Sequence, residues 1–130
     1  ELSFQVFGAP WLDPVEFLPF LSDEDFPGIA FSRCAFPAGN KMYEGLDIDG
    51  IRITVANRGA FRPFSSAMKL LTLIFREYRP ERTWLHPSTR QQWFNALYGM
   101  PALWESITTG EPFEYDNSAY LATREEALLY

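Results

Sequence analysis

Residues 50–55 read Gly50-Ile51-Arg52-Ile53-Thr54-Val55. Their β-branched side chains alternate with other residues, which is typical of a strand that is buried on one face. From Ser65 the spacing of the apolar residues changes to three and four positions, which places them along one side of a helix. These apolar residues are Ala67, Leu70, Leu71, Ile74, Phe75 and Tyr78, and Pro80 ends the segment. The change of period predicts a strand followed by a long amphipathic helix.

Shorter segments on either side predict the other elements. Residues 2–7 and 29–36 have the pattern of strands, and Asp13 can cap a helix that begins at Pro14 and is kept short by Pro19. Three later helices are predicted: one after Ser88 that turns Trp93, Phe94, Leu97 and Tyr98 inward and stops before Gly99, one from Pro101 to Gly110, and one over residues 118–130.

The order of these elements indicates the fold class. Strands are interleaved with helices in the first part of the chain and helices follow alone, which predicts an α+β or α/β fold. We expect residues 1–130 to form a single compact domain with a small mixed sheet, several packed helices and a helical C-terminal third. A chain of 130 residues can bury a core without disulfides or a structural metal.

The composition excludes several classes of function. Eleven basic against 17 acidic residues give a formal net charge of −6, whereas a general nucleic-acid binder needs a basic surface. No run of about 18 apolar residues occurs, so we expect no membrane insertion. The chain has one histidine, His86, and one cysteine, Cys34. They lack the spacing of a metal site, and no phosphate-loop motif is present, so we expect neither a metal nor a cofactor.

The best candidate for a binding site is the long segment of residues 37–47, which has no usable period. Long loops without secondary structure of their own are usually functional or mobile. Between Gly39 and Gly45 this loop carries an amide, a cation, a phenol and a carboxylate within five residues, namely Asn40, Lys41, Tyr43 and Glu44. Trp11 is a second candidate, since it follows a strand and could offer a flat ring to a sugar. An equally good interpretation makes Trp11 an anchor of the core.

Two catalytic arrangements are conceivable from the residue types. Cys34 and His86 could form a nucleophile pair, but a buried Cys34 and a loop position for His86 are the simpler interpretation. A glycoside hydrolase needs two carboxylates on either side of the scissile bond. Glu44 with Asp47 or Asp49 could supply them, although solvated loop charges are again the simpler interpretation.

Several segments together resemble one known family. The run from Phe4 to Trp11, Phe-Gln-Val-Phe-Gly-Ala-Pro-Trp, is similar to the "F-x-x-x-G-A-P-W" segment of the NamZ-type exo-β-N-acetylmuramidases, long catalogued as a domain of unknown function. Further matches follow in the family's order: Phe36-Pro37, Lys41, Gly45, residues 50–55, Phe61-Arg62-Pro63, Leu97-Tyr98-Gly99, Gly110, Arg124 and Leu128-Leu129-Tyr130. The chain departs from the family pattern at Ile48, where cysteine is common, and at Asn57, where aspartate is usual.

The resemblance implies a place within a larger bacterial enzyme that degrades cell-wall peptidoglycan. Members of this family have an N-terminal Rossmann-like catalytic domain and a C-terminal auxiliary domain, with the substrate cleft between them. They remove N-acetylmuramic acid from the non-reducing end of peptidoglycan fragments, which implies a periplasmic or secreted location. This chain is expected to begin just past the domain junction and to end at a natural C-terminus.

On this interpretation the chain is inactive alone and contains no catalytic residue. Trp11, Asn40, Lys41, Tyr43 and Glu44 would bind a peptidoglycan-derived sugar, with Lys41 facing the lactyl carboxylate and Trp11 stacked on a pyranose ring. Two alternatives stay open. One is a stand-alone module that binds a glycan or a protein, and the other is a self-sufficient hydrolase built on the carboxylates named above.

Overall fold

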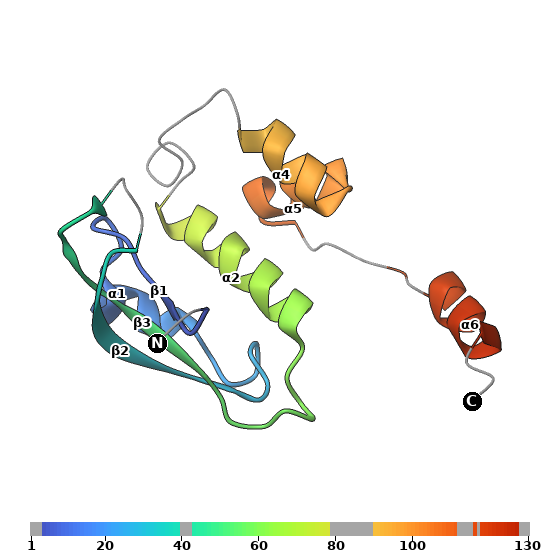
Figure 1. Ribbon diagram of the computed structural model, residues 1–130, viewed down its shortest axis with the longest axis horizontal. Coiled ribbons are helices and arrows are strands. Elements are labelled where there is room, and N and C mark those ends of the chain that lie inside the picture. Colours follow the sequence, from blue (N-terminus) through green and yellow to red (C-terminus); the bar gives the residue numbers. More distant parts are fainter. Residues whose placement is uncertain (1–3, 40–42, 79–89, 112–115, 117, 128–130) are drawn as a thin grey trace.

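The computed structural model describes residues 4–39, 43–78, 90–111, 116 and 118–127, and the side chains of residues 90 and 93 lie outside the description. Within these residues three strands form one sheet in the order β1-β3-β2. Some of the helices lie beside this sheet and the later ones lie further from it (Figure 1). The strands are β1 (Val6–Phe7), β2 (Ile29–Pro37) and β3 (Asp47–Val55). The helices are α1 (Pro14–Phe17) with a 3₁₀ turn η1 (Leu18–Phe20), α2 (Pro63–Tyr78), α4 (Arg90–Tyr98), α5 (Pro101–Thr109) and α6 (Ser118–Ala127).

This arrangement confirms the α+β class, with one difference in the sheet. Both described strand pairs are antiparallel, whereas a mixed sheet was expected. The reason is the length of the connections. The β2–β3 connection is a hairpin, and an antiparallel pair needs only a short turn while a parallel pair needs a long crossover. The strand predicted over residues 50–55 lies within β3, which begins three residues earlier.

The β2–β3 hairpin forms most of the sheet. Its register runs from Ile29 opposite Val55 to Pro37 opposite Asp47, and the Ala38 N–H donates to the Leu46 carbonyl at 2.9 Å where the loop begins. Because directly opposite residues share a face of the sheet, this register fixes which side chains of the two strands lie together.

The first strand is much shorter than the segment of residues 2–7 suggested. β1 pairs with β3 at Val6 and Phe7, and one more bond runs from the Ile53 N–H to the Gln5 carbonyl at 2.7 Å. Phe4 has a left-handed backbone with φ of +59°, so the described chain turns there instead of continuing the strand. Residues 1–3 lie outside the description.

The start of α1 follows the prediction. The Asp13 carboxylate accepts hydrogen bonds from the backbone N–H groups of Val15 at 2.8 Å and Glu16 at 3.4 Å, and Pro14 occupies the first turn. The α-helix ends after four residues and continues as the 3₁₀ turn that contains Pro19. A proline at that place lacks the N–H that an α-helix would use.

The long helix α2 separates two hydrophobic cores. On one side Leu70, Ile74 and Tyr78 pack against a core under the sheet, whose buried members are Leu12, Phe17, Leu21, Phe26, Ile29 and Ile51. On the other side Met68 and Phe75 join Phe94, Leu103 and Ile107 of α4 and α5. The single stripe predicted for this helix is therefore too narrow, because the helix is covered on two sides. Ala67, which was placed in that stripe, is exposed.

The two helices after this point end as predicted but bury fewer residues. Gly99 and Gly110 follow α4 and α5 with φ of +68° and +79°, the left-handed conformation that glycine adopts at little cost. Phe94 is buried, but Leu97 is 60% exposed, so the prediction that Leu97 faces inward is wrong. The α4–α5 contact passes through Phe94, and Leu97 lies on the side of α4 that no described element covers. Ser88 and the Trp93 side chain lie outside the description.

The last helix, α6, stands apart from the other elements in Figure 1. All ten of its residues are exposed, which is unusual for a helix of this length because short helices in water need packing to be stable. None of the helices among the described residues is long and apolar enough to span a membrane.

Candidate functional site

The segment between β1 and α1 lies against the hairpin end of the sheet. At Gly8 a Cβ atom would lie only 2.9 Å from the Ile48 side chain and 3.0 Å from the Gly50 backbone, which shows how closely this segment passes the start of β3. The Leu12 N–H then donates to the Ala9 carbonyl at 3.0 Å and closes a turn. This turn carries Trp11 to the end of the sheet from which the hairpin loop projects.

Trp11 is half-buried there against the last residue of α2. Its ring centroid lies 5.4 Å from that of Tyr78 with an interplanar angle of 58°. The Trp11 side chain also packs on the core under the sheet and is only partly buried, so it is an anchor that keeps some exposed surface. The two interpretations made from the sequence are thus compatible for this residue.

Tyr78 is held in place by the backbone of Asp13. The Asp13 N–H donates to the Tyr78 hydroxyl at 3.1 Å, and that hydroxyl lies 3.4 Å from the Asp13 carbonyl, which accepts from it. Burial raises the pKa of the Tyr78 phenol, and the hydrogen bond to Asp13 opposes this in part. Tyr78 is therefore a neutral, fixed partner for the Trp11 ring at neutral pH.

The hairpin loop supplies the other predicted site residues. Tyr43 is half-buried and Glu44 is exposed, and the Leu46 N–H donates to the Tyr43 carbonyl at 3.0 Å. Gly45 is the third residue of this turn and has a φ of +83°, in the left-handed region that favours glycine. Asn40 and Lys41 lie outside the described residues. Figure 1 shows the described part of the hairpin loop and the last turn of α2 at the same end of the sheet, and Trp11 contacts Tyr78 in that last turn.

Asp49, one of the carboxylates that the sequence offered for a glycosidase, is held in an ion pair on the sheet. Arg33 binds Asp49 through two nitrogens, with Nε to Oδ1 at 2.8 Å and Nη2 to Oδ2 at 2.6 Å. The Arg33 hydrogen bond holds the pKa of the Asp49 carboxyl below its usual value. A general acid in a glycosidase needs a raised pKa instead, so Asp49 is unsuited to that role.

The other sequence candidates find little support in the described part of the chain. Cys34 is half-buried on β2, and His86 lies outside the description, so their pairing is not seen. Among the described residues no three His, Cys, Asp or Glu side chains lie close enough together to hold a metal ion.

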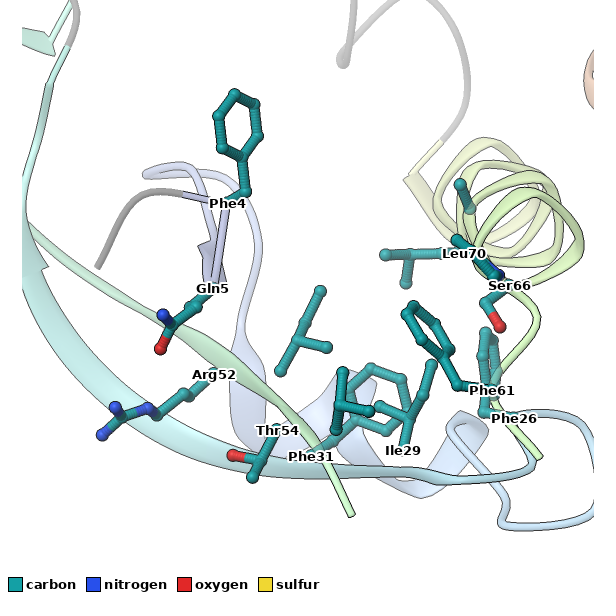
Figure 2. A pocket seen from close by; sticks show the side chains of 14 residues that line it. Phe4, Gln5, Phe26, Ile29, Phe31, Arg52, Thr54, Phe61, Ser66 and Leu70 are labelled. Carbon is teal, nitrogen blue, oxygen red and sulfur yellow. The ribbon is translucent and has the colours of Figure 1, made fainter. Parts of the chain in front are cut away.

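A pocket that the sequence did not indicate lies between the far end of β3 and the first half of α2. Its volume is about 520 Å³, a size that suits a small ligand or a pair of inserted side chains. Figure 2 shows Phe61, Phe26 and Ile29 beside Ser66 and Leu70, with Phe4 standing at a distance from this group. The lining also includes Phe31, Ile53, Val55, Pro63, Ala67, Gln5, Arg52 and Thr54.

None of the predicted site residues lines this pocket. The apolar periods of β3 and α2 place Ile53 and Leu70 on inner faces, but they do not show that space stays unfilled between those faces. No signal in the sequence could have found it, because a void depends on how two distant elements pack.

Comparison with known proteins gives the class and then the family. The three-stranded sheet with its helices has the fold of part of a DUF1343 family protein from Bacteroides fragilis NCTC 9343, with a TM-score of 0.68 at 15% identity. The match covers 81% of this chain and 28% of that one, so the chain spans little more than a quarter of its neighbour's length. A search among curated proteins found no match.

The family itself is shown by a match over the whole chain. Residues 1–130 match the family described as exo-beta-N-acetylmuramidase NamZ, C-terminal. The chain belongs to this family and is thus a domain from a family of glycoside hydrolases, which confirms the resemblance found in the sequence.

Proposed function

We propose that this chain completes the sugar-binding cleft of a peptidoglycan-degrading glycoside hydrolase of the exo-β-N-acetylmuramidase type. The catalytic domain precedes it in the same protein, and the chain alone hydrolyses nothing. The observation that carries the proposal is that Trp11 and the hairpin loop lie at the same end of the sheet, in a chain that matches the C-terminal NamZ family over its full length.

The aromatic side of this region suits a sugar ring. Pyranose rings present C–H groups on one face, and an anchored indole offers them a flat apolar surface. Trp11 has this character because Tyr78 and the core fix its orientation while part of the ring stays exposed. A ring fixed before binding loses little conformational entropy when a sugar stacks on it.

The polar side of the region is the hairpin loop. Tyr43 and Glu44 offer hydroxyl and carboxylate groups to sugar hydroxyls, and Asn40 adds an amide. Lys41 is the cation that meets the lactyl carboxylate of muramic acid. With a net charge of −6, the chain needs such a local cation to hold an acidic sugar.

The chain's own carboxylates support a non-catalytic role. Asp49 is committed to Arg33 with a lowered pKa, and Glu44 is exposed on the loop. Hydrolysis needs one raised and one ionised carboxyl group at a defined separation. The catalytic pair is therefore assigned to the preceding domain.

The test compares the full-length protein with the 130-residue chain. Release of N-acetylmuramic acid from peptidoglycan fragments is expected from the full-length protein and not from the chain. In the full-length protein, Lys41→Ala and Tyr43→Ala should each lower kcat/KM by about tenfold or more, because each removes a contact to the sugar. Lys69→Ala is the matched control, because it removes a lysine that is not among the predicted site residues and whose ammonium group is bound to Asp25.

The outcomes separate the alternatives that the sequence left open. If both loop variants stay within about twofold of the wild type, the site assignment is wrong. If the full-length protein binds the fragments without cleaving them, the chain belongs to a binding module. If the isolated chain releases the sugar, the self-sufficient hydrolase is correct.

A further inference from the structure

The pocket beside β3 lies next to the N-terminal residues of the described chain. Phe4 is the first described residue, and it lines the pocket along with Gln5. The matched family is the C-terminal part of NamZ, so in the proposed function the catalytic domain joins this chain on the side of the pocket. Trp11 and the hairpin loop, in contrast, lie at the other end of β3.

Phe4 itself lacks the surroundings that a phenylalanine normally has. Its side chain is fully exposed, and its backbone is left-handed, which costs a non-glycine residue about 1–2 kcal/mol. Contact with another protein segment would remove this ring from water. Figure 2 shows the ring pointing away from the other labelled side chains, toward the outside of the fold.

The pocket wall is apolar and offers few groups for specific recognition of a polar ligand. Four phenylalanines contribute to it, and Ile29, Ile53 and Leu70 complete its inner surface. Ser66 is buried at 6% exposure and carries the single buried hydroxyl among these residues. Such a surface is suited to apolar side chains from another protein segment.

We infer that the pocket is the docking surface for the catalytic domain that precedes this chain, which inserts one or two large apolar side chains beside Phe4. The inference takes its partner from the proposed function. Because that domain belongs to the same polypeptide, it has a high effective concentration at the pocket. The domain is large enough to reach the sugar-binding end as well, because β3 spans only about 30 Å and this chain covers 28% of its structural neighbour.

The test uses a charge placed inside the pocket and the same charge placed beside it. Ala67 is exposed and lines the pocket, so Ala67→Glu should block docking without disturbing the core. Ser65→Glu adds the same charge two positions away on α2, at a residue outside the lining. Both variants should match the wild-type chain in circular dichroism, which establishes that α2 is intact.

The first measurement uses the neutral dye Nile red. The 130-residue chain should enhance its fluorescence, and Ala67→Glu should reduce that enhancement by about fivefold while Ser65→Glu leaves it unchanged. In the full-length protein the enhancement should be absent, because the docked domain fills the pocket. Enhancement in the full-length protein that Ala67→Glu removes would show an open pocket and overturn the inference.

The second measurement is limited proteolysis at the domain junction of the full-length protein. Ala67→Glu should accelerate cleavage by about tenfold, because burying an unpaired carboxylate under the docked domain is costly. Equal rates for Ala67→Glu and Ser65→Glu would contradict docking at this surface. Release of N-acetylmuramic acid is followed in parallel. A covered pocket without any sugar release rejects the proposed function alone, and normal release with an open pocket rejects the docking surface alone.

Discussion

The hydroxyl of Tyr78 and the backbone of Asp13 join two elements that are 65 residues apart in the sequence. The Asp13 N–H donates to this hydroxyl at 3.1 Å, and the hydroxyl in turn donates to the Asp13 carbonyl at 3.4 Å. Asp13 is also the N-cap of α1, so the same residue begins α1 and is hydrogen-bonded to the last residue of α2. The pair fixes the position of Trp11, whose ring lies against Tyr78.

Tyr78→Phe should therefore destabilise the chain without emptying the core. The ring stays, but the hydroxyl is lost, and a typical hydrogen bond contributes about 0.5–1.5 kcal/mol. The expected fall in Tm is about 2–6 °C for a chain of this size. Thermal unfolding followed by circular dichroism measures it. Tyr120→Phe on α6 removes a hydroxyl from a ring that is 65% exposed, and it should leave Tm unchanged. An equal fall in both variants would contradict the role of the Asp13 contact.

The parts of this fold that could be predicted are those with a local cause. The alternation in residues 50–55 and the cap at Asp13 depend on neighbours in the sequence, and both elements occur where expected. The division of α2 between two cores has no local signal. Met68 and Phe75 face α5, while Leu70 faces the sheet, and only the packing of distant helices decides this.

The ion pair between Arg33 and Asp49 predicts how stability depends on pH. The Arg33 hydrogen bond lowers the pKa of Asp49 in the folded state. A lowered folded-state pKa contributes stability above the unfolded-state pKa, near 4, and this contribution disappears as the pH falls through the folded-state pKa.

Asp49→Asn should accordingly lower Tm at neutral pH and have little effect near pH 2. Both side chains are about half exposed, so the neutral-pH effect should be small, about 1–3 °C, and weaker in high salt. Asp47→Asn, on the same strand and face, is the matched control because it leaves the Arg33–Asp49 pair intact. A Tm loss that persists unchanged at low pH would show that Asp49 stabilises the sheet in some other way.

Replacing glycine by alanine should have opposite effects on stability at Gly50 and at Gly39. A Cβ at Gly50 would lie 2.6 Å from the Phe7 carbonyl oxygen and 2.7 Å from the Phe36 ring, so Gly50→Ala must displace β1. The expected loss is about 1–3 kcal/mol in the free energy of unfolding.

Gly39→Ala meets no described atom within 4 Å and removes freedom from the unfolded chain. It should raise the free energy of unfolding by about 0.4–1 kcal/mol. Urea unfolding of the two variants measures both effects. A gain in stability for Gly50→Ala would mean that β1 does not approach β3 this closely.

The candidate site could be predicted only in part. Tyr43 and Glu44 stand out because a polar loop interrupts two strands, and this pattern is local. The contact of Trp11 with Tyr78 joins residues 67 positions apart (78 − 11), so no pattern in the sequence could indicate that the ring is anchored. The pocket near Phe4 was missed for the same reason, since its walls come from the sheet and from α2.

A substitution series at Trp11 separates its structural role from sugar binding. Trp11→Ala in the full-length protein should lower Tm, because the ring packs on the core and on Tyr78, and should also lower kcat/KM by about a hundredfold. Trp11→Tyr keeps an aromatic face of smaller area, so it should restore most of Tm and leave kcat/KM within about tenfold of the wild type. Ile107→Val controls for stability alone, since it shortens a buried side chain in the core formed with α4 and α5 and should lower Tm without changing KM. If Trp11→Tyr recovers stability while KM and kcat match those of Trp11→Ala, the indole is needed for more than stacking. If kcat/KM simply follows Tm across all three variants, Trp11 is only an anchor and the sugar lies elsewhere.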